Sequence, residues 1–85
     1  MKQFRYIIQD ELGIHARPAG LFAKEVKKYV SSVKIKKGEK EVSAEQLLML
    51  MGLGVKKGDE VVVTIEGIDE EIVYNALLTF FQTNL

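Results

Sequence analysis

His15 is the only histidine of the chain, and Arg17 follows it after one intervening residue. The segment GIHARP, residues 13–18, should end a loop and begin a helix, because proline is tolerated in the first turn of a helix. A helix N-terminus presents unpaired backbone N–H groups and partial positive charge, which attract an anion such as phosphate. Imidazole is a nucleophile, and the arginine fork matches phosphoryl oxygens. The spacing therefore predicts a histidine that accepts and holds a phosphoryl group.

The same positive field disfavours an imidazolium ion, so we expect a neutral, nucleophilic ring at His15 near pH 7. A histidine and an arginine at this spacing are a weak signal by themselves. The alternative that stays open from the spacing is that His15 is an incidental residue of the first turn and that Arg17 is a solvated charge.

The hydrophobic periodicity predicts seven elements in the order βαββαβα, which position this segment. Period-two alternation places strands at about residues 2–9, 32–37, 39–42 and 61–65. A helical period starts at Ala16 and reaches Tyr29. A short helix should begin near Ser43, whose spacing to Gln46 is typical of a capping box, and end before Gly52. The last helix should run from an N-cap at Asp69 to about residue 83.

The two long helices each show an apolar face. In the first, the expected buried positions are Ala19, Phe22, Ala23, Val26 and Val30, and the opposite face holds Arg17, Leu21, Lys24 and Lys28. In the last, the expected stripe is Val73, Leu77 and Phe81 with Ile72, Ala76 and Phe80. These patterns predict an α/β (α+β) open-faced β-sandwich: a four-stranded antiparallel sheet with three helices on one face, in a single domain over residues 1–85.

Composition excludes several classes of site. The 85 residues include no cysteine, which excludes disulfides, thiolate zinc sites and thiol catalysis, and one histidine excludes a His-rich metal site. No apolar run approaches the roughly 18 residues of a membrane span, and the N-terminus lacks the apolar core of a signal peptide, so we expect no membrane insertion and a cytoplasmic protein.

The formal net charge is zero, but it is distributed unevenly. Residues 1–42 contain ten basic and five acidic side chains, whereas residues 43–85 contain two basic and seven acidic ones. A nucleic-acid binder would be basic throughout, so we expect no nucleic-acid partner. The asymmetry indicates either two solvated halves or a basic surface that docks an acidic protein.

Two stretches of the chain resemble a known family. GIHARPAG, residues 13–20, is similar to the active-site signature of the HPr family, the histidine-containing phosphocarriers of the bacterial phosphoenolpyruvate:sugar phosphotransferase system. The MGLGV stretch, residues 51–55, resembles that family's MSLGV-like segment at the same spacing. Chain length and the order of elements fit as well, so the resemblance spans essentially the whole chain.

The resemblance implies a phosphoryl relay without cofactor or metal. Enzyme I, charged by phosphoenolpyruvate, would phosphorylate Nδ1 of His15, and enzyme IIA would then receive the group. Arg17 would neutralise phosphoryl oxygens, the backbone amides of Ala16 and Arg17 would donate to them, and Pro18 would set the geometry of the first turn. Such a protein is a carrier intermediate and not a stand-alone catalyst.

The resemblance also implies a partner-binding surface. Leu47, Leu48 and Met51 match an exposed apolar patch, and Lys24 and Lys28 would supply positive charge beside it. The alternative is that the apolar residues are ordinary core, because the run at 47–51 goes all round a helix. Met49 and Leu50 stay unassigned between the two, and nothing in the chain requires more than a monomer.

One position departs from the family's regulated members. Gln46 stands where Gram-positive relatives have a serine that a dedicated kinase phosphorylates, so we expect no regulatory serine in this chain. Two other functions remain open: a regulatory HPr-like or nitrogen-branch paralogue, and a non-catalytic interaction module in which His15 is inert.

Overall fold

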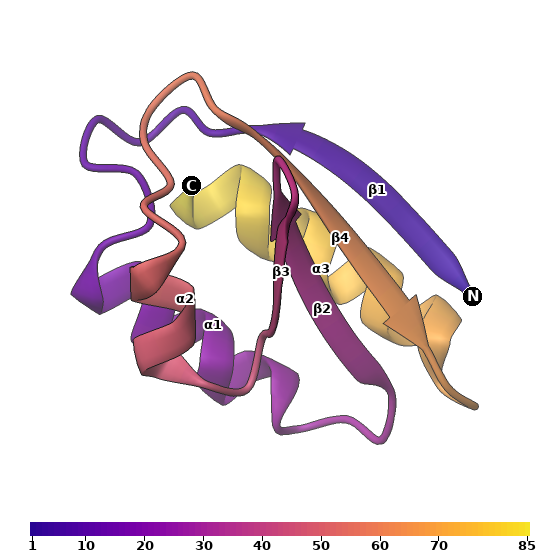
Figure 1. The fold of residues 1–85 in the computed structure, drawn as a ribbon. Helices are drawn as coiled ribbons and strands as arrows, with labels where there is room; N and C mark the ends of the chain where they lie inside the picture. Colours follow the sequence, from indigo (N-terminus) through magenta and orange to yellow (C-terminus); the bar gives the residue numbers. More distant parts are fainter.

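The computed structural model describes residues 1–85 and contains the seven elements in the predicted order (Figure 1). The strands and helices, with their bounds, are β1 (Lys2–Ile7), α1 (Ala16–Val26), β2 (Ser32–Lys37), β3 (Lys40–Ser43), α2 (Leu47–Gly52), β4 (Glu60–Glu66) and α3 (Glu70–Asn84).

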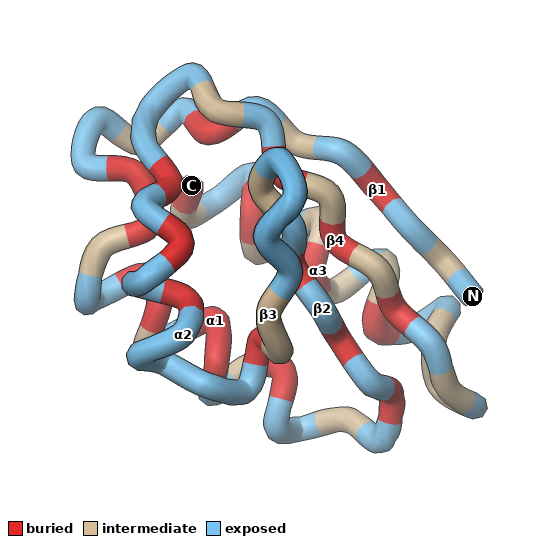
Figure 2. The backbone as a smooth tube through the Cα atoms, in the orientation of Figure 1, coloured by how far each residue is buried: buried red, intermediate tan, exposed pale blue.

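The four strands form one antiparallel sheet in the order β1-β4-β2-β3. Val63 of the central strand β4 lies between Phe4 of β1 and Ile35 of β2. Buried and exposed residues alternate along β2 (Figure 2), as expected for a sheet with one covered and one open face. The three helices cover the buried face, which confirms the predicted open-faced sandwich (Figure 1).

The core between sheet and helices is one cluster of 20 buried residues. Phe81 of α3 lies at its centre and makes edge-to-face contacts with Phe4, Tyr6 and Phe22, at ring-centroid distances of 5.4, 5.4 and 5.1 Å. Because Phe22 belongs to α1, this contact fixes the helix that begins at His15 relative to the sheet. None of the helices is both long enough and apolar enough to span a bilayer.

The start of α2 differs from the sequence prediction. The helix begins at Leu47 with Gln46 as N-cap, not near Ser43. Ser43 instead ends β3, where it pairs with Lys34 of β2, so pairing with the sheet overrides the local capping signal. Val30 was also wrongly assigned to the core: α1 ends at Val26, and Val30 is 76% exposed in the turn that follows.

The stripe of α3 is confirmed for Val73, Leu77 and Phe81, which are fully buried. Ile72 was wrongly included in it and is 66% exposed. The buried face of α3 is therefore narrower than the apolar stripe predicted from the sequence. The remaining two members of the predicted stripe, Ala76 and Phe80, are partly buried.

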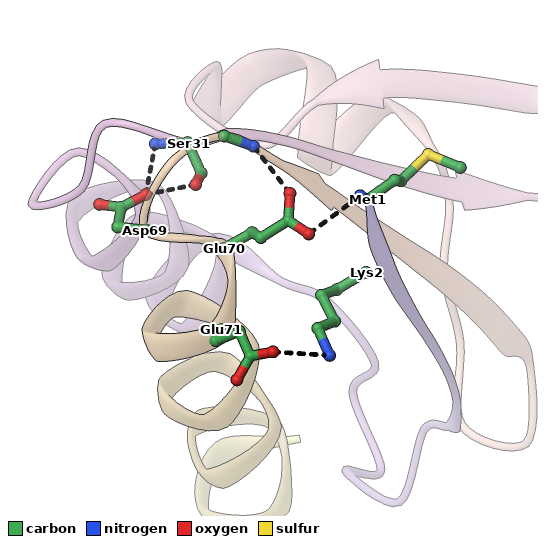
Figure 3. Close-up of polar contacts among 7 residues, drawn as sticks. Met1, Lys2, Ser31, Asp69, Glu70 and Glu71 are labelled. Atoms are coloured by element: carbon green, nitrogen blue, oxygen red, sulfur yellow. Dashed lines mark hydrogen bonds and ion pairs between the residues drawn. The ribbon is translucent and has the colours of Figure 1, made fainter.

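Asp69 precedes α3 as predicted, but its carboxylate does not cap that helix (Figure 3). It accepts hydrogen bonds from the backbone N–H groups of Val30 and Ser31, each at 2.9 Å, and from the Ser31 hydroxyl. The carboxylate therefore joins the start of α3 to the turn between α1 and β2. The Ser31 hydroxyl and then the Val30 amide hold the pKa of Asp69 below its ordinary value.

We predict that Asp69→Asn lowers the melting temperature by several degrees at neutral pH. The depressed pKa means that the ionised carboxylate stabilises the folded state, and this contribution is present above the unfolded pKa and is lost as pH falls through the folded one. The difference in melting temperature between wild type and variant should therefore shrink below about pH 4. Calorimetry at a series of pH values measures this difference in melting temperature. Glu66→Gln removes the same charge from an exposed position without a partner, and an equal effect there would contradict the prediction.

Candidate functional site

His15 is the N-cap residue of α1, where the chain leaves a loop in an extended conformation. Its imidazole makes no hydrogen bond, and the side chain is 36% exposed. The backbone carbonyl of His15 accepts the first bond of the helix from Ala19 at 3.0 Å. The ring is thus held at the helix start by its backbone, while neither of its nitrogens makes a hydrogen bond.

Two backbone donors beside the ring have no partner. The N–H groups of Ala16 and Arg17 make no hydrogen bond in the protein, and Pro18 has none to offer. The Arg17 guanidinium is likewise free of ion pairs and hydrogen bonds on the exposed surface. Unpaired N–H groups, the helix dipole and a free guanidinium favour a bound dianion such as a phosphoryl group.

His15, Arg17 and Pro18 line a hollow of about 390 Å³. It lies between the loop after β1, the first turns of α1 and the last turn of α3. We name it the His15 hollow, and its lining consists of Asp10, Leu12, His15, Arg17, Pro18, Leu21, Thr83 and Asn84. The structure brings together no group of three or more side chains that could hold a metal ion.

The loop before His15 rests on the loop between α2 and β4, and the two run side by side (Figure 1). The N–H of Ile14 donates to the carbonyl of Val55 at 3.2 Å. Gly13 has a positive φ of 66°, and a Cβ atom there would lie 2.1 Å from that same carbonyl oxygen. Only glycine permits this close approach, which sets the backbone that leads into His15.

An ion pair fixes the supporting loop in turn. The Lys37 ammonium contacts the Asp59 carboxylate at 3.0 Å and donates to the carbonyl of Gly54 at 2.8 Å. Asp59 also accepts the backbone N–H of Lys56 at 2.8 Å. The Lys56 amide and then the Lys37 ammonium hold the pKa of Asp59 below its ordinary value. Residues 54–59 are therefore tied to β2 on one side and to the loop before His15 on the other.

Helix α2 exposes most of its apolar side chains. Only Leu50 is buried, which assigns it to the core, while Met49 is exposed with the three positions predicted to be so. We call the four exposed residues the apolar patch: Leu47, Leu48, Met49 and Met51. Leu48 is the most exposed, at 80%. A cluster of four large exposed apolar residues on one short helix is typical of a protein-binding surface.

Helix α1, the source of the predicted positive charge, packs against α2 (Figure 1). Lys24 is exposed on α1 and has no ion-pair partner. Lys28 lies beyond the end of the helix and pairs with Glu25 at 3.0 Å, which raises the pKa of the lysine. The predicted lysines are therefore not equivalent: Lys24 is available to an acidic partner, and Lys28 is already engaged.

The structure brings His15, Arg17 and Pro18 of the GIHARP segment to one hollow, together with five residues that the sequence pattern did not assign to a site, of which three are polar. Asp10 lies in the loop after β1, and Thr83 and Asn84 come from the end of α3. No spacing signal connects these residues to His15, because the fold alone brings them together. Asp10 lies beside the histidine ring, with 3.8 Å between its Oδ1 and Nε2 of His15.

Residues 2–83 match the sequence model of the family described as "PTS HPr component phosphorylation site". The chain belongs to the HPr family. Among curated relatives, it is 37% identical over 78 residues to the phosphocarrier protein HPr of Mycoplasma pneumoniae, which covers 91% of this chain and 89% of the relative. The resemblance of the segments at 13–20 and 51–55 is therefore confirmed as family membership.

Solved structures of HPr-family proteins share the fold. The crystal structure of HPr-C-His from Thermoanaerobacter tengcongensis superposes with a TM-score of 0.92 at 36% identity, covering 98% of this chain and 93% of that one. Crh, a catabolite repression protein of Bacillus subtilis, gives a TM-score of 0.78 at 33% identity over 100% and 98% of the two chains, and its crystal structure is a domain-swapped dimer.

Proposed function

We propose that this chain is a phosphocarrier of the phosphoenolpyruvate-dependent sugar phosphotransferase system, which accepts a phosphoryl group on His15. One observation carries the proposal: an imidazole without a hydrogen bond and a free Arg17 guanidinium line one hollow at a helix N-terminus, where two backbone N–H groups are unpaired. Family membership supports it over an inert interaction module. The donor is enzyme I and the acceptor is an enzyme IIA.

The carrier's chemical task is positioning and charge stabilisation. The electron pair of Nδ1 of His15 forms the N–P bond while the bond between phosphorus and the donor nitrogen breaks. Most of the transition-state charge lies on the phosphoryl oxygens. The amides of Ala16 and Arg17 and the Arg17 guanidinium oppose that charge, and Pro18 stiffens the turn that presents them. No cofactor takes part in this transfer.

Intact-mass spectrometry after incubation with phosphoenolpyruvate and a cognate enzyme I tests the proposal. The expected result is a gain of one phosphate that disappears on acidification, as a phosphoramidate should. A competent enzyme I that modifies a reference HPr but adds no phosphate to this protein would contradict the carrier function.

We expect Arg17→Ala to slow phosphoryl acceptance about tenfold to a hundredfold, because one of the few groups that oppose the phosphoryl charge is lost. The fold should be unaffected, since the guanidinium is exposed and makes no ion pair or hydrogen bond. Quenched-flow transfer from phosphorylated enzyme I measures the rate. Arg5→Ala on the open face of the sheet is the matched control, and Arg17→Lys should restore part of the rate. A wild-type rate for Arg17→Ala would remove this residue from the mechanism.

The apolar patch, with the positive charge of Lys24 and Arg17 beside it, is the surface that we propose docks enzyme I and enzyme IIA. An apolar centre ringed by charge suits recognition of an acidic partner. Lys28 contributes to the surrounding field, although its ammonium is paired with Glu25.

Leu48→Glu should weaken binding to enzyme I about tenfold or more while stability changes by no more than about 0.5 kcal/mol. The reason is that Leu48 is 80% exposed and so contributes contact area to a partner, not to the core. Titration calorimetry and thermal melting measure the two effects. Val30→Glu, at a position 76% exposed in the turn after α1, is the matched control. Equal loss of binding for both variants would place the docking surface elsewhere.

Two negative expectations accompany the carrier function. The core is complete within one chain, which supports a monomer, and sedimentation velocity distinguishes this from a dimer such as that of Crh. Gln46 offers no hydroxyl for regulatory phosphorylation, although it does occupy the N-cap of α2 at the edge of the apolar patch. Incubation with a kinase that modifies that position in relatives should therefore leave this protein unmodified.

A further inference from the structure

Asp10 is held in place beside the imidazole of His15. Its Oδ1 accepts the backbone N–H of Leu12 at 2.8 Å, and its carbonyl accepts that of Gly13 at 3.0 Å. Its own N–H donates to the carbonyl of Leu85 at 2.8 Å. The same Oδ1 lies 3.8 Å from Nε2 of His15. Two hydrogen bonds thus hold the backbone of Asp10, and the Leu12 N–H orients its carboxylate beside the ring.

We propose that Asp10 is a positioning residue that keeps the proton of the neutral imidazole on Nε2, so that the lone pair of Nδ1 is free for the phosphoryl group. The inference rests on the proposed function, because phosphorylation at Nδ1 requires the tautomer with its proton on Nε2. A neutral imidazole has one N–H, and a carboxylate favours the tautomer whose N–H faces it. The separation exceeds a hydrogen-bond length in the free protein, and such contacts tighten when charge develops.

The contact between Asp10 and the His15 ring also acts during phosphoryl transfer. When the Nδ1 pair forms the N–P bond, the donor's N–P electrons return to the donor nitrogen, and the ring of His15 becomes cationic with its proton still on Nε2. The Asp10 carboxylate then faces a positive ring and stabilises it. When the phosphoryl group leaves, the N–P electrons return to Nδ1. No proton moves when the N–P bond forms or when it breaks. The Asp10 carboxylate can assist both steps because it lies at Nε2, whereas the phosphoryl group is carried on Nδ1.

No other acidic side chain makes an ion pair with the His15 ring. Glu11 is the next acidic residue along the chain, and it is exposed. Arg17 lines the same hollow but makes no ion pair with Asp10.

Asp10→Asn tests the inference with little change in shape, because an amide oxygen can still accept the Leu12 N–H while the charge is gone. Correlation spectra of ¹⁵N-labelled protein, recorded at a pH where the ring is neutral, report the tautomer. We expect the population with the proton on Nδ1 to rise roughly fivefold. The turnover for phosphoryl transfer from enzyme I should fall about tenfold with an unchanged KM.

Glu11→Gln, which removes the same charge one residue away, is the matched control and should leave both readings unchanged. A wild-type tautomer ratio in Asp10→Asn would overturn the inference, even if transfer were slower, since a general charge effect would then explain the rate. The tautomer spectrum needs no enzyme I. A wild-type protein that accepts no phosphate would therefore contradict the proposed function. The tautomer spectrum would still show whether Asp10 determines which ring nitrogen holds the proton.

Discussion

His15→Ala should abolish phosphoryl acceptance and leave the folded structure intact. The chain has no second histidine and no cysteine, so no other imidazole and no thiolate can replace His15 as the phosphoryl acceptor. The imidazole makes no hydrogen bond and contributes nothing to the core, which predicts a melting temperature close to that of the wild type. The rate of phosphate gain from enzyme I and thermal melting, measured on the same preparation, separate the two effects.

Leu12→Ala is the matched control for this variant, because Leu12 lines the same hollow, is largely exposed and carries no nucleophile. Its acceptance rate should remain within the range of the wild type. An acid-labile phosphate on His15→Ala would show that the acceptor is another residue and would contradict the account of the site.

Gly13→Ala should cost about 2 kcal/mol of stability or more and should also slow transfer. A side chain at Gly13 meets two penalties: a φ of 66°, which disfavours L-residues, and a Cβ only 2.1 Å from the carbonyl oxygen of Val55. The neighbouring backbone must shift, and it is the backbone that supports Ile14 and His15. A loss of this size lowers the melting temperature of a small domain by roughly 10 °C.

Gly38→Ala separates the two penalties. Gly38 has a similar φ of 59°, but nothing lies within 4 Å of a Cβ added there, and the residue is in the turn between β2 and β3. This control should lose less stability than Gly13→Ala and keep the transfer rate of the wild type. If both variants lose stability equally, contact with Val55 is not what requires glycine before the histidine.

The fold was predictable where a local pattern and the final packing agree. Alternation located β2 at its observed residues, and Pro18 marked the first turn of α1. Prediction failed where a distant partner decides. Ser43 carries a capping signal but pairs with Lys34 across the sheet, and Asp69 bonds to Val30 and Ser31 instead of to its own helix. A single sequence does not reveal which distant group a polar side chain will find.

The candidate site divides in the same way. His15 and Arg17 lie close together in the sequence, so their spacing was enough to indicate a phosphoryl site. Asp10 lies beside the ring only because hydrogen bonds hold its loop. One bond lies within the loop, and the N–H groups of residues 9 and 10 donate to the carbonyl of Leu85 at the end of α3. Exposure of the apolar patch also needed the structure, because a run of five apolar residues does not reveal which one is buried.

Nuclear magnetic resonance of ¹⁵N-labelled protein phosphorylated by enzyme I tests the phosphocarrier proposal by locating the phosphorus atom. We predict a one-bond coupling between phosphorus and Nδ1 of His15, with the ring proton on Nε2, the nitrogen that faces Asp10. A phosphorus atom coupled to Nε2, or bound as an acid-stable ester to a serine, threonine or tyrosine, would contradict it.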